Sequence, residues 1–418
     1  MTGPNPRRWL WPGLASAAVA LTTGGVVVLI VVLVSGSAPR ARPSPSGTGR
    51  SISVASAAPT ASSTTPAPTP RTPALPAPAG EQLGAGVNGL FNGRHYGADL
   101  IDAELAALRR TGATIAHSDS LWELIEPQPP VNGAHHYDWR FDDSIAGSLA
   151  AHGLRWLPIL DYSASWARAS PGRLHSPPAT PTDYAAYAAA FVARYGPGGA
   201  FWSSHPSLTP EPVATVEIWN EPDDPSFWSP TPDASRYAEL YLSARSAISA
   251  VDDRMGVIVG GLTKPTTFLA AMLAARPELR NQIDGVAIHP YAPGPLGVLA
   301  GVRAARLALG TLGLSSLPLY VTEFGWTTRP PGALHYAPER LRPSYISSTV
   351  AALGHLDCGL AAGVLYTWMT AERDPGNAQD WFGISSPQPA ATPDTIAFAT
   401  GIAKARAPGA QNSLCGGG

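Results

Sequence analysis

The sequence predicts an α/β protein built on a closed parallel (β/α)8 (TIM) barrel, preceded by an apolar N-terminal helix and a disordered linker. From residue 81 to about residue 410, short apolar runs alternate with longer segments rich in Ala and Leu. The longer segments have the 3.6-residue apolar spacing of helices with one buried face. Eight strand-like runs in such an alternation fit one barrel, and a doubly wound open sheet is the alternative.

The eight strand-like runs are short and bounded by turn-forming or polar residues. In chain order they span residues 83–91, 113–120, 155–163, 213–220, 255–262, 284–291, 317–326 and 363–370. The clearest helical segments between them are residues 98–112, 183–196, 234–252 and 339–356. The first run also contains Gly84-Ala85-Gly86-Val87-Asn88-Gly89, which matches a dinucleotide-binding pattern. Because we expect strand rather than helix from Val87 to Phe91, we do not predict a nucleotide site there.

An uncharged apolar run from Leu14 to Val34 follows Arg7 and Arg8 and is about as long as a membrane-spanning helix. The segment after it is rich in Pro, Ala, Ser and Thr and contains no aromatic or acidic residue before residue 81, which is typical of a disordered spacer. We therefore expect an extracytoplasmic domain anchored to the cell membrane. A cleaved signal peptide and a secreted protein are the alternative.

These expectations divide the chain into five parts. They are a cytoplasmic segment at 1–12, a transmembrane signal-anchor at 13–36, a disordered linker at 37–80, the barrel at 81–410 and a C-terminal tail at 411–418.

Charge and cysteine content exclude several classes of function. The net charge is −2 and only 14% of the residues are charged, so nucleic acid is not an expected partner. The two cysteines, Cys358 and Cys415, form no metal-binding pattern, and we expect a disulfide between them, with two free thiols as the alternative. We expect neither a metal nor a cofactor, and we expect His135 and His136 to lie in a solvated loop.

Polar and aromatic side chains follow most of the predicted strands. They are Asn88, His117, Asp119, Asp161, Tyr162, Asn220, Glu221, His289, Tyr291, Glu323 and Trp368. In a parallel barrel the carboxyl ends of the strands meet at one face, which carries the active site. Glu221 and Glu323 follow the fourth and seventh strands, on opposite sides of that mouth. Two carboxyl groups facing each other across a pocket are what cleavage of a glycosidic bond requires.

At these motifs the chain resembles clan A of the glycoside hydrolases. Asn220-Glu221-Pro222 after the fourth strand and Thr322-Glu323-Phe324-Gly325-Trp326 on the seventh carry the resemblance, which covers about residues 82 to 400. The stretches "WNEPDD", "PILDYSASW" and "SLWELIEP" are most similar to family 39, with the cellulase-like family 5 next. The resemblance implies a retaining (β/α)8 glycosidase that cleaves a β-linked oligo- or polysaccharide.

The resemblance also implies roles for individual residues. Glu221 would be the acid/base and Glu323 the nucleophile, with their carboxyl groups about 5–5.5 Å apart. Asn220 would bind the sugar 2-hydroxyl, His289 and Tyr291 would line the reactive-sugar subsite, and Trp368 would be its aromatic platform. The remaining expected substrate contacts are His117, Asp161, Tyr162 and Trp326.

Two points stay open in the sequence. The clan usually has an Arg on the second strand that keeps the nucleophile ionised, whereas this chain has His117 at that place. Either His117 or another cation takes over, or activity is weaker than the pattern suggests. The alternative to an enzyme is a non-catalytic cell-surface carbohydrate-binding protein on the same barrel. Further aromatic residues expected near the cleft are Trp166, Trp228 and Trp381. We expect Asp223, Asp224 and Asp380 to order loops, and we expect a monomer.

Overall fold

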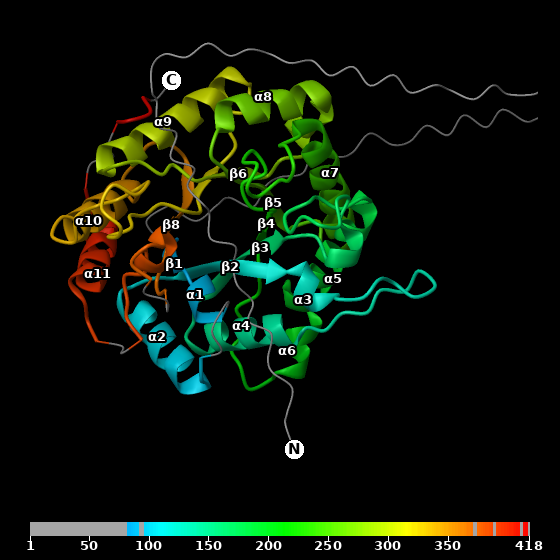
Figure 1. The fold of residues 1–418 in the computed structure, drawn as a ribbon, viewed down its shortest axis with the longest axis horizontal. Helices are drawn as coiled ribbons and strands as arrows, with labels where there is room; N and C mark the ends of the chain where they lie inside the picture. The colour runs from blue at the N-terminus through cyan, green and yellow to red at the C-terminus, as the bar shows by residue number, and fades with distance from the viewer. Residues whose placement is uncertain (1–81, 92–95, 371–373, 388–389, 410–412, 417–418) are drawn as a thin grey trace, which may run out of the picture. The chain divides into compact units, whose positions relative to one another are not determined.

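Eight parallel strands pair in chain order and close on themselves, so that β1 contacts both β2 and β8. This arrangement, in a computed structural model, confirms the closed barrel and excludes the open sheet (Figure 1). The structure describes residues 82–91, 96–370, 374–387, 390–409 and 413–416. The predicted anchor and linker fall outside these residues. Within the part of the chain that is described, no helix combines the length and apolarity needed to cross a bilayer.

Each barrel strand overlaps one of the eight predicted runs. They are β1 (Leu83–Gly86), β2 (Ile115–Leu121), β3 (Arg155–Asp161), β4 (Thr215–Ile218), β5 (Gly256–Leu262), β6 (Gly285–Ile288), β7 (Leu319–Val321) and β8 (Leu360–Leu365).

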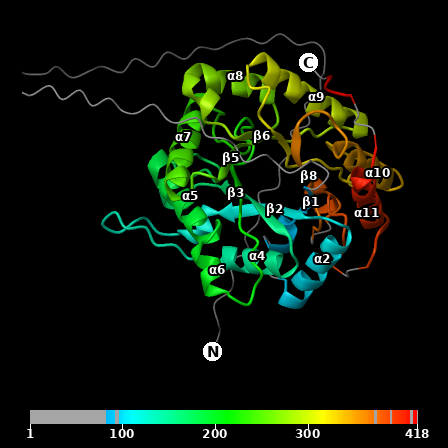
Figure 2. The same cartoon turned by 180° about the vertical axis from the view of Figure 1, so that it is seen from behind.

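Helices surround the strands, as the two opposite views in Figures 1 and 2 show. They are α1 (Asn88–Phe91), α2 (Ala98–Arg110), α3 (Trp122–Ile125), α4 (Arg140–Ala151), α5 (Pro181–Tyr195), α6 (Ala200–Ser204), α7 (Ala234–Val251), α8 (Pro265–Ala275), α9 (Pro295–Thr311), α10 (Arg342–Leu353) and α11 (Pro393–Arg406).

The inward faces of the strands change from apolar to polar toward the mouth of the barrel. Side chains at alternate positions of a strand share a face. An apolar cluster inside the barrel includes Ile115 of β2 and Leu157 of β3. Two positions further along β2 is His117, which pairs with Glu217 of β4, and both side chains are buried. Buried charged groups are costly unless they are paired. Apolar packing alone does not require such a layer, so we expect it to serve the polar groups at the mouth of the barrel.

Two sequence expectations are wrong. Residues Asn88–Phe91 form α1 rather than a continuation of the first strand, because Leu90 N hydrogen-bonds to Val87 O and turns the chain. Gly84 and Gly86 lie within β1 and pair with β2, so they form no phosphate-binding loop. The second concerns His135, which is only partly solvated: its side chain is 20% exposed and its Nδ1 lies 2.8 Å from Oε1 of the fully buried Glu126, whereas His136 is exposed as expected.

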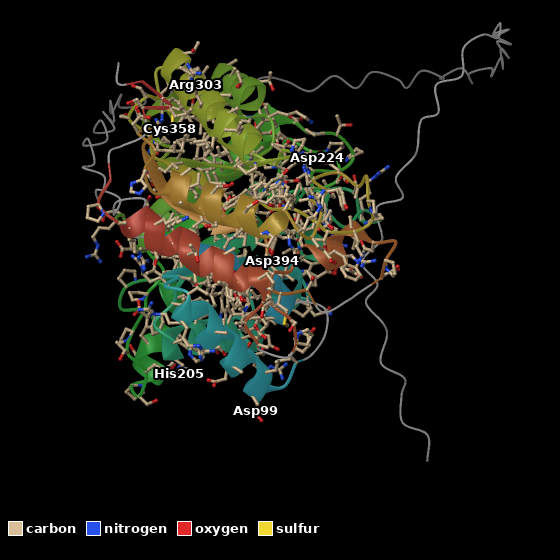
Figure 3. The ribbon with its side chains drawn as sticks, turned by 90° about the vertical axis from the view of Figure 1, so that its left-hand side faces the viewer. Asp99, His205, Asp224, Arg303, Cys358 and Asp394 are labelled. Atoms are coloured by element: carbon tan, nitrogen blue, oxygen red, sulfur yellow. A yellow bond between two sulfur atoms is a disulfide. The ribbon has the colours of Figure 1, made fainter. Side chains whose placement is uncertain are left out.

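A disulfide joins Cys358 to Cys415 with their Cα atoms 5.3 Å apart (Figure 3). Cys358 precedes β8 and is fully buried. The backbone N of Cys415 also donates to Asp357 Oδ1 at 2.8 Å. The bond therefore attaches the C-terminal tail to the barrel beside β8, as the sequence predicts.

Candidate active site

Glu221 and Glu323 lie on either side of one imidazole at the mouth of the barrel. His289, which follows β6, places Nδ1 2.8 Å from Glu221 Oε1 and 3.7 Å from Glu323 Oε2. One oxygen of each carboxyl group and this nitrogen all lie within 4.8 Å of one another. The two Glu side chains are only 12% and 13% exposed. The fourth and seventh strands thus bring together two nearly buried carboxyl groups with a shared partner.

The backbone bends sharply where it presents Glu221. Trp219 and Glu221 have φ angles of +66° and +42°, which side-chain-bearing residues rarely adopt and which cost on the order of 1 kcal/mol or more each. Trp219 is fully buried, donates from Nε1 to Phe227 O at 2.8 Å and packs edge-on against Tyr162 and Trp228. This packing holds Trp219 in a strained backbone conformation, and such conformations are frequent at functional sites.

His289 carries the positive charge of the site. Burial opposes its protonation, but Glu323 and the hydrogen bond to Glu221 outweigh burial and raise the pKa of His289 to about 9. As an imidazolium it donates from Nδ1 to Glu221 and from Nε2 to Thr322 Oγ1 at 3.1 Å. Burial raises the pKa of Glu221, while His289 opposes that rise. Glu221 is therefore suited to carry a proton at a higher pH than an exposed Glu.

The neighbouring polar side chains engage the same two carboxyl-bearing segments. The Tyr291 hydroxyl donates to Glu323 Oε2 at 2.7 Å, and burial followed by the Glu323 charge raises the pKa of Tyr291, so the hydroxyl keeps its proton. Asn220 donates from Nδ2 to the Tyr162 hydroxyl at 3.2 Å. Its Oδ1 is buried and accepts no hydrogen bond from the described residues. That oxygen is free to accept a hydroxyl proton from a ligand.

His117 does not take the place expected of a cation beside Glu323. Its Nε2 lies 3.0 Å from Glu217 Oε2, inside the barrel. Glu217 Oε1 accepts from Gly261 N at 2.5 Å and from Thr322 Oγ1 at 3.4 Å. A Cβ at Gly261 would lie 2.0 Å from His289 Nε2, so only glycine leaves room for that ring. The cation beside Glu323 is His289, and His117 supports it only through Glu217 and Thr322.

Asp161 and Asp119 are further buried acids at the ends of β3 and β2. Asp161 is fully buried, and neither carboxyl oxygen meets a hydrogen-bond partner among the described residues. Burial, followed by the charges of Asp119, Glu217 and Glu323, raises the pKa of Asp161 well above its usual range. Asp119 accepts from Asn88 Nδ2 at 3.0 Å and donates its backbone N to Asn88 Oδ1 at 3.0 Å. The raised pKa of Asp161 favours its protonated form over its ionised form.

The structure contradicts the roles expected of the tryptophans. Trp368 is 1% exposed and donates from Nε1 to Glu104 Oε2 of α2 at 2.8 Å, so it packs under the helices and cannot be a sugar platform. Trp326 is equally buried, donates to Ala292 O and packs on Tyr345. Trp228 is also buried, between Trp219 and Tyr237.

Tyr366, which directly follows β8, is an aromatic residue that does reach the site, and the sequence expectations missed it. Its ring lies edge-on to Tyr291 at 6.4 Å between centroids and is partly exposed. Burial raises its pKa first, followed by the charges of Glu323, Asp119 and Glu221, so its ring lies among these carboxyl groups. Trp166 and Trp381 are partly exposed but hydrogen-bond to the backbone, at Glu126 O and Asp374 O respectively.

Asp223, Asp224 and Asp380 accept hydrogen bonds from loop backbone, as expected of residues that order loops. Asp223 accepts from Thr263 N at 3.1 Å and from Lys264 N at 2.5 Å, and so ties the loop after β4 to the start of α8. Asp224 accepts from Ser226 N at 2.8 Å. Asp380 accepts from Asp374 N at 2.9 Å in the loop after β8.

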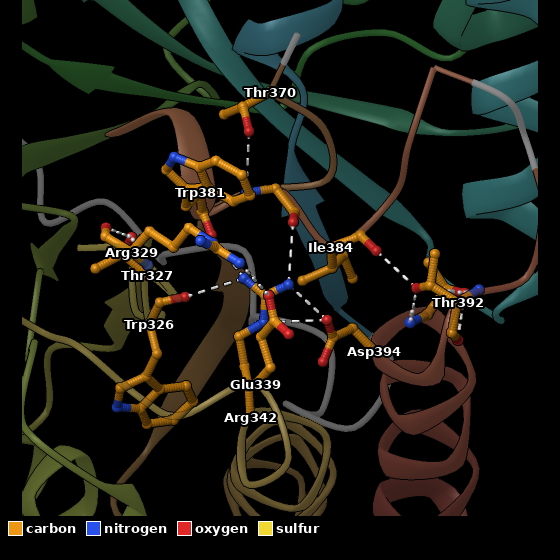
Figure 4. Close-up of polar contacts among 12 residues, drawn as sticks. Trp326, Thr327, Arg329, Glu339, Arg342, Thr370, Trp381, Ile384, Thr392 and Asp394 are labelled. Carbon is orange, nitrogen blue, oxygen red and sulfur yellow. Dashed lines mark hydrogen bonds and ion pairs between the residues drawn. The ribbon is translucent and has the colours of Figure 1, made fainter. Parts of the chain in front are cut away.

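Arg342 connects the two loops that border the site after β7 and β8 (Figure 4). It is the first residue of α10 and is buried. Its guanidinium donates twice to Asp394 Oδ2, at 3.0 and 2.5 Å, and to the carbonyl oxygens of Trp326, Trp381 and Gly383 at 2.7 to 3.4 Å. One side chain therefore satisfies the backbone of both loops.

We expect Arg342→Met to lower the free energy of unfolding by about 3–5 kcal/mol, because it leaves Asp394 buried without its charge partner. Urea unfolding followed by circular dichroism measures this change. Arg140→Met, which breaks an ion pair with Asp138 in which both side chains are exposed, is the matched control and should change stability little. Equal effects of the two substitutions would contradict the role of Arg342.

Among the described residues, we find no second group of this kind. A surface hollow of about 670 Å³ lies at the opposite end of the barrel, between the carboxyl ends of α5 and α7, and is lined by Gly196 and Arg254 among others. Glu221, His289 and Glu323 are also residue types that bind cations. Their hydrogen bonds to one another and to Tyr291 account for their positions, and we assign them to proton chemistry.

Together, these observations describe a (β/α)8 barrel with an acid–imidazole–acid group at its mouth. No model of a known protein family matches the sequence, and no curated protein matches it. Solved structures do match. A monomeric β-xylosidase from Caulobacter crescentus aligns at 21% identity and a TM-score of 0.58, over 78% of this chain and 69% of the other.

Two further structures represent the two families that the sequence resembles. The family 39 glycoside hydrolase from Xanthomonas axonopodis aligns at 19% identity and a TM-score of 0.60, over 78% of this chain and 67% of the other. A family 5 protein from Streptomyces cattleya, solved with N-acetylglucosamine, aligns at 14% identity and a TM-score of 0.60, over 80% and 83%. These similarities establish the fold of this chain.

Proposed function

We propose that this chain is a retaining glycoside hydrolase that cleaves O-glycosidic bonds of a β-linked saccharide. The observation that carries the proposal is the Glu221–His289–Glu323 group, in which one oxygen of each carboxyl lies within 4.8 Å of the other. Retaining glycosidases have carboxyl groups about 5–5.5 Å apart, whereas inverting enzymes need about 6.5–9.5 Å to admit a water molecule. The short separation therefore favours a double displacement.

In the first step, Glu323 attacks the anomeric carbon and the glycosidic C–O bond breaks. Glu221, whose pKa is raised by burial, protonates the departing oxygen. The bond between sugar and Glu323 replaces the bond to the leaving group, giving a glycosyl-enzyme ester. The Tyr291 hydroxyl and the His289 imidazolium support the Glu323 carboxylate before the attack.

In the second step, the ionised Glu221 takes a proton from water, and the hydroxide attacks the anomeric carbon and releases Glu323. The charge of Glu323 is one cause of the raised pKa of Glu221. Because that charge is absent in the ester, the pKa of Glu221 falls as the intermediate forms. The acid of the first step thus becomes the base of the second, and configuration at the anomeric carbon is retained.

The polar groups around the pair suit a sugar ring. Asn220 Oδ1 and both oxygens of Asp161 are buried and lack partners among the described residues, so they can bind hydroxyl groups. The neutral form of Asp161 both donates and accepts. Tyr366 supplies the aromatic face against which sugar C–H groups pack. Family 5 structures with similar folds were solved with saccharides, including Manβ1-4GlcNAc in the protein from Bifidobacterium longum.

We further propose that the domain works outside the membrane. The apolar run from Leu14 to Val34 and the linker-like composition after it support a tethered enzyme. Sequencing the N-terminus of the mature protein distinguishes this arrangement from secretion after cleavage.

A panel of aryl β-glycosides and β-glycans tests the function, with wild type, Glu221→Ala and Glu323→Ala assayed side by side. We expect the wild type to hydrolyse at least one class of substrate and both variants to lose that activity. Activity that survives both substitutions would disprove the assignment. Binding without hydrolysis across the panel would instead favour a non-catalytic carbohydrate-binding protein.

The charge on His289 should set the alkaline side of the pH profile. Activity is lost as pH rises through the pKa of Glu221, because only the protonated form donates. His289 lowers that pKa, so His289→Gln should move the alkaline limb of kcat/KM to higher pH. His136→Gln, at an exposed histidine, is the control and should leave the limb in place. A shift to lower pH, or none, would contradict this role.

A further inference from the structure

A five-residue sequence occurs twice in loops on opposite sides of the barrel mouth. Residues 171–175 read Pro-Gly-Arg-Leu-His, and residues 331–335 read Pro-Gly-Ala-Leu-His. The first copy lies between β3 and α5 and the second between β7 and α10. In a closed barrel of eight strands, β3 and β7 are four strands apart, so the two loops face each other across the catalytic end. We call them the PGxLH loops.

The two copies share two backbone hydrogen bonds but differ in conformation, because Gly332 and His335 have φ angles of +81° and +63° whereas Gly172 and His175 do not have positive φ. Arg173 N donates to Ser170 O at 3.0 Å, and the equivalent Ala333 N donates to Pro330 O at 3.1 Å. Three residues along, Ser176 N donates to Arg173 O at 3.3 Å. The matching bond, from Tyr336 N to Ala333 O, measures 3.1 Å. The repeated sequence therefore gives the same two turn hydrogen bonds on both sides of the barrel mouth.

The histidine of each loop packs on a tyrosine of the active site. The His175 ring lies 4.3 Å from the ring of Tyr162, whose hydroxyl accepts from Asn220. The His335 ring stacks at 4.7 Å on Tyr291, whose hydroxyl donates to Glu323. Each loop is thus separated by one aromatic ring from the groups that flank the reacting bond.

Both imidazoles are suited to neutral hydrogen bonding. Burial lowers the pKa of His175 and of His335, so neither ring is charged at neutral pH. His175 Nδ1 lies 2.6 Å from the carbonyl oxygen of Ser226. Since a carbonyl only accepts, Nδ1 carries the proton and Nε2 is left as an acceptor.

The leucine before each histidine is exposed to solvent. Leu174 is 46% exposed and Leu334 is 79% exposed. A single exposed leucine is unremarkable. Here a leucine stands beside a histidine on both sides of the Glu221–Glu323 pair. The two leucines place apolar surface where a ligand would emerge from the site. Neutral imidazoles with apolar neighbours suit an uncharged group that has an apolar face and hydroxyl groups at its edge.

We propose that the PGxLH loops form the binding site for the leaving group of the substrate, and that this group has an apolar face, as an aryl group or a second sugar ring does. The inference rests on the proposed glycosidase function and adds the residues that select the part of the substrate beyond the cleaved bond. Leu174 and Leu334 contact that face, and the His175 Nε2 acceptor binds a hydroxyl at its edge.

Kinetics with matched substrates test the inference in the full chain. Phenyl and methyl β-glycosides of one sugar differ only in the leaving group. The double variant Leu174→Ala/Leu334→Ala should lose roughly 10-fold or more in kcat/KM for the phenyl glycoside and should keep its activity on the methyl glycoside. Leu307→Ala is the control: it lies at an exposed leucine near the carboxyl end of α9, and it should change kcat/KM for neither glycoside. Equal losses on both substrates, or an equal loss in the control, would overturn the inference.

A binding measurement separates failure of the inference from failure of the function. In the full-length Glu323→Gln variant with ¹³C-labelled leucine methyl groups, phenyl β-glycosides should shift the NMR signals of Leu174 and Leu334 but not of Leu307. If this variant binds the phenyl glycosides, or the wild type hydrolyses them, and these shifts are absent, the inference is overturned and the proposed function stands. Absence of turnover and binding for the whole panel would overturn the proposed function with it. Xylobiose and cellobiose in place of the phenyl glycosides show whether a sugar ring occupies the same loops.

Discussion

Replacing Glu323 with Gln should reduce kcat on any hydrolysed β-glycoside by roughly 10⁴-fold or more, because an amide cannot form the glycosyl ester. Losses of this order are typical when a catalytic nucleophile is removed. The fold should persist, since the Gln side-chain oxygen can still accept from the Tyr291 hydroxyl at the 2.7 Å position. Initial rates with an aryl glycoside, together with circular dichroism, measure both effects.

Glu278→Gln supplies the control for this substitution. Glu278 is exposed and lies in the short helical segment Pro277–Asn281, after α8 and away from the catalytic face. Its replacement should leave kcat unchanged. If Glu323→Gln retained most of the wild-type rate while Glu278→Gln behaved normally, Glu323 would not be the nucleophile.

Replacing Glu221 with Ala should have an effect that depends on the leaving group. Substrates with poor leaving groups need protonation and should lose roughly 10²–10⁴-fold in kcat/KM, the usual contribution of general acid catalysis. A 2,4-dinitrophenyl glycoside departs without a proton, so its first step should be spared and its second step should become limiting. Added azide, which needs no general base, should then restore turnover and give a glycosyl azide.

The same loss for all leaving groups, with no rescue by azide, would contradict an acid/base role for Glu221. Such a result would fit a residue that only shapes the site. Asp224→Ala, at the acid that caps the following turn, should show no dependence on the leaving group and serves as the comparison.

The barrel and the meeting of Glu221 and Glu323 at its mouth could be predicted from the sequence because both leave local signals. Buried parallel strands are nearly continuous apolar runs, and helices with one buried face have a 3.6-residue period. The acids at Glu221 and Glu323 interrupt that pattern at strand ends, where the fold gathers side chains. Their contacts with His289 depend on the closure of β4, β6 and β7 around one axis, which no local pattern reports.

Tyr366 reaches the site and the expected Trp368 does not, for a structural reason. Tyr366 and Trp368 would share a face if β8 continued, but the strand ends at Leu365. Beyond it, Trp368 turns outward to the buried Glu104 of α2, a partner more than 260 positions away in the sequence. The pairing of His117 with Glu217 could not be predicted from the sequence either. Both the sequence and the clan resemblance place a cation of the second strand beside Glu323 instead.

Trapping the covalent intermediate tests most directly whether Glu221 and Glu323 form a retaining pair. The Glu221→Ala variant, incubated with a panel of 2,4-dinitrophenyl β-glycosides, should accumulate a glycosyl-enzyme because its second step lacks a base. Mass spectrometry of a rapid acid quench should show one added sugar, and peptide mapping should place it on Glu323. Release of dinitrophenol with no adduct, or an adduct on another residue, would contradict the mechanism.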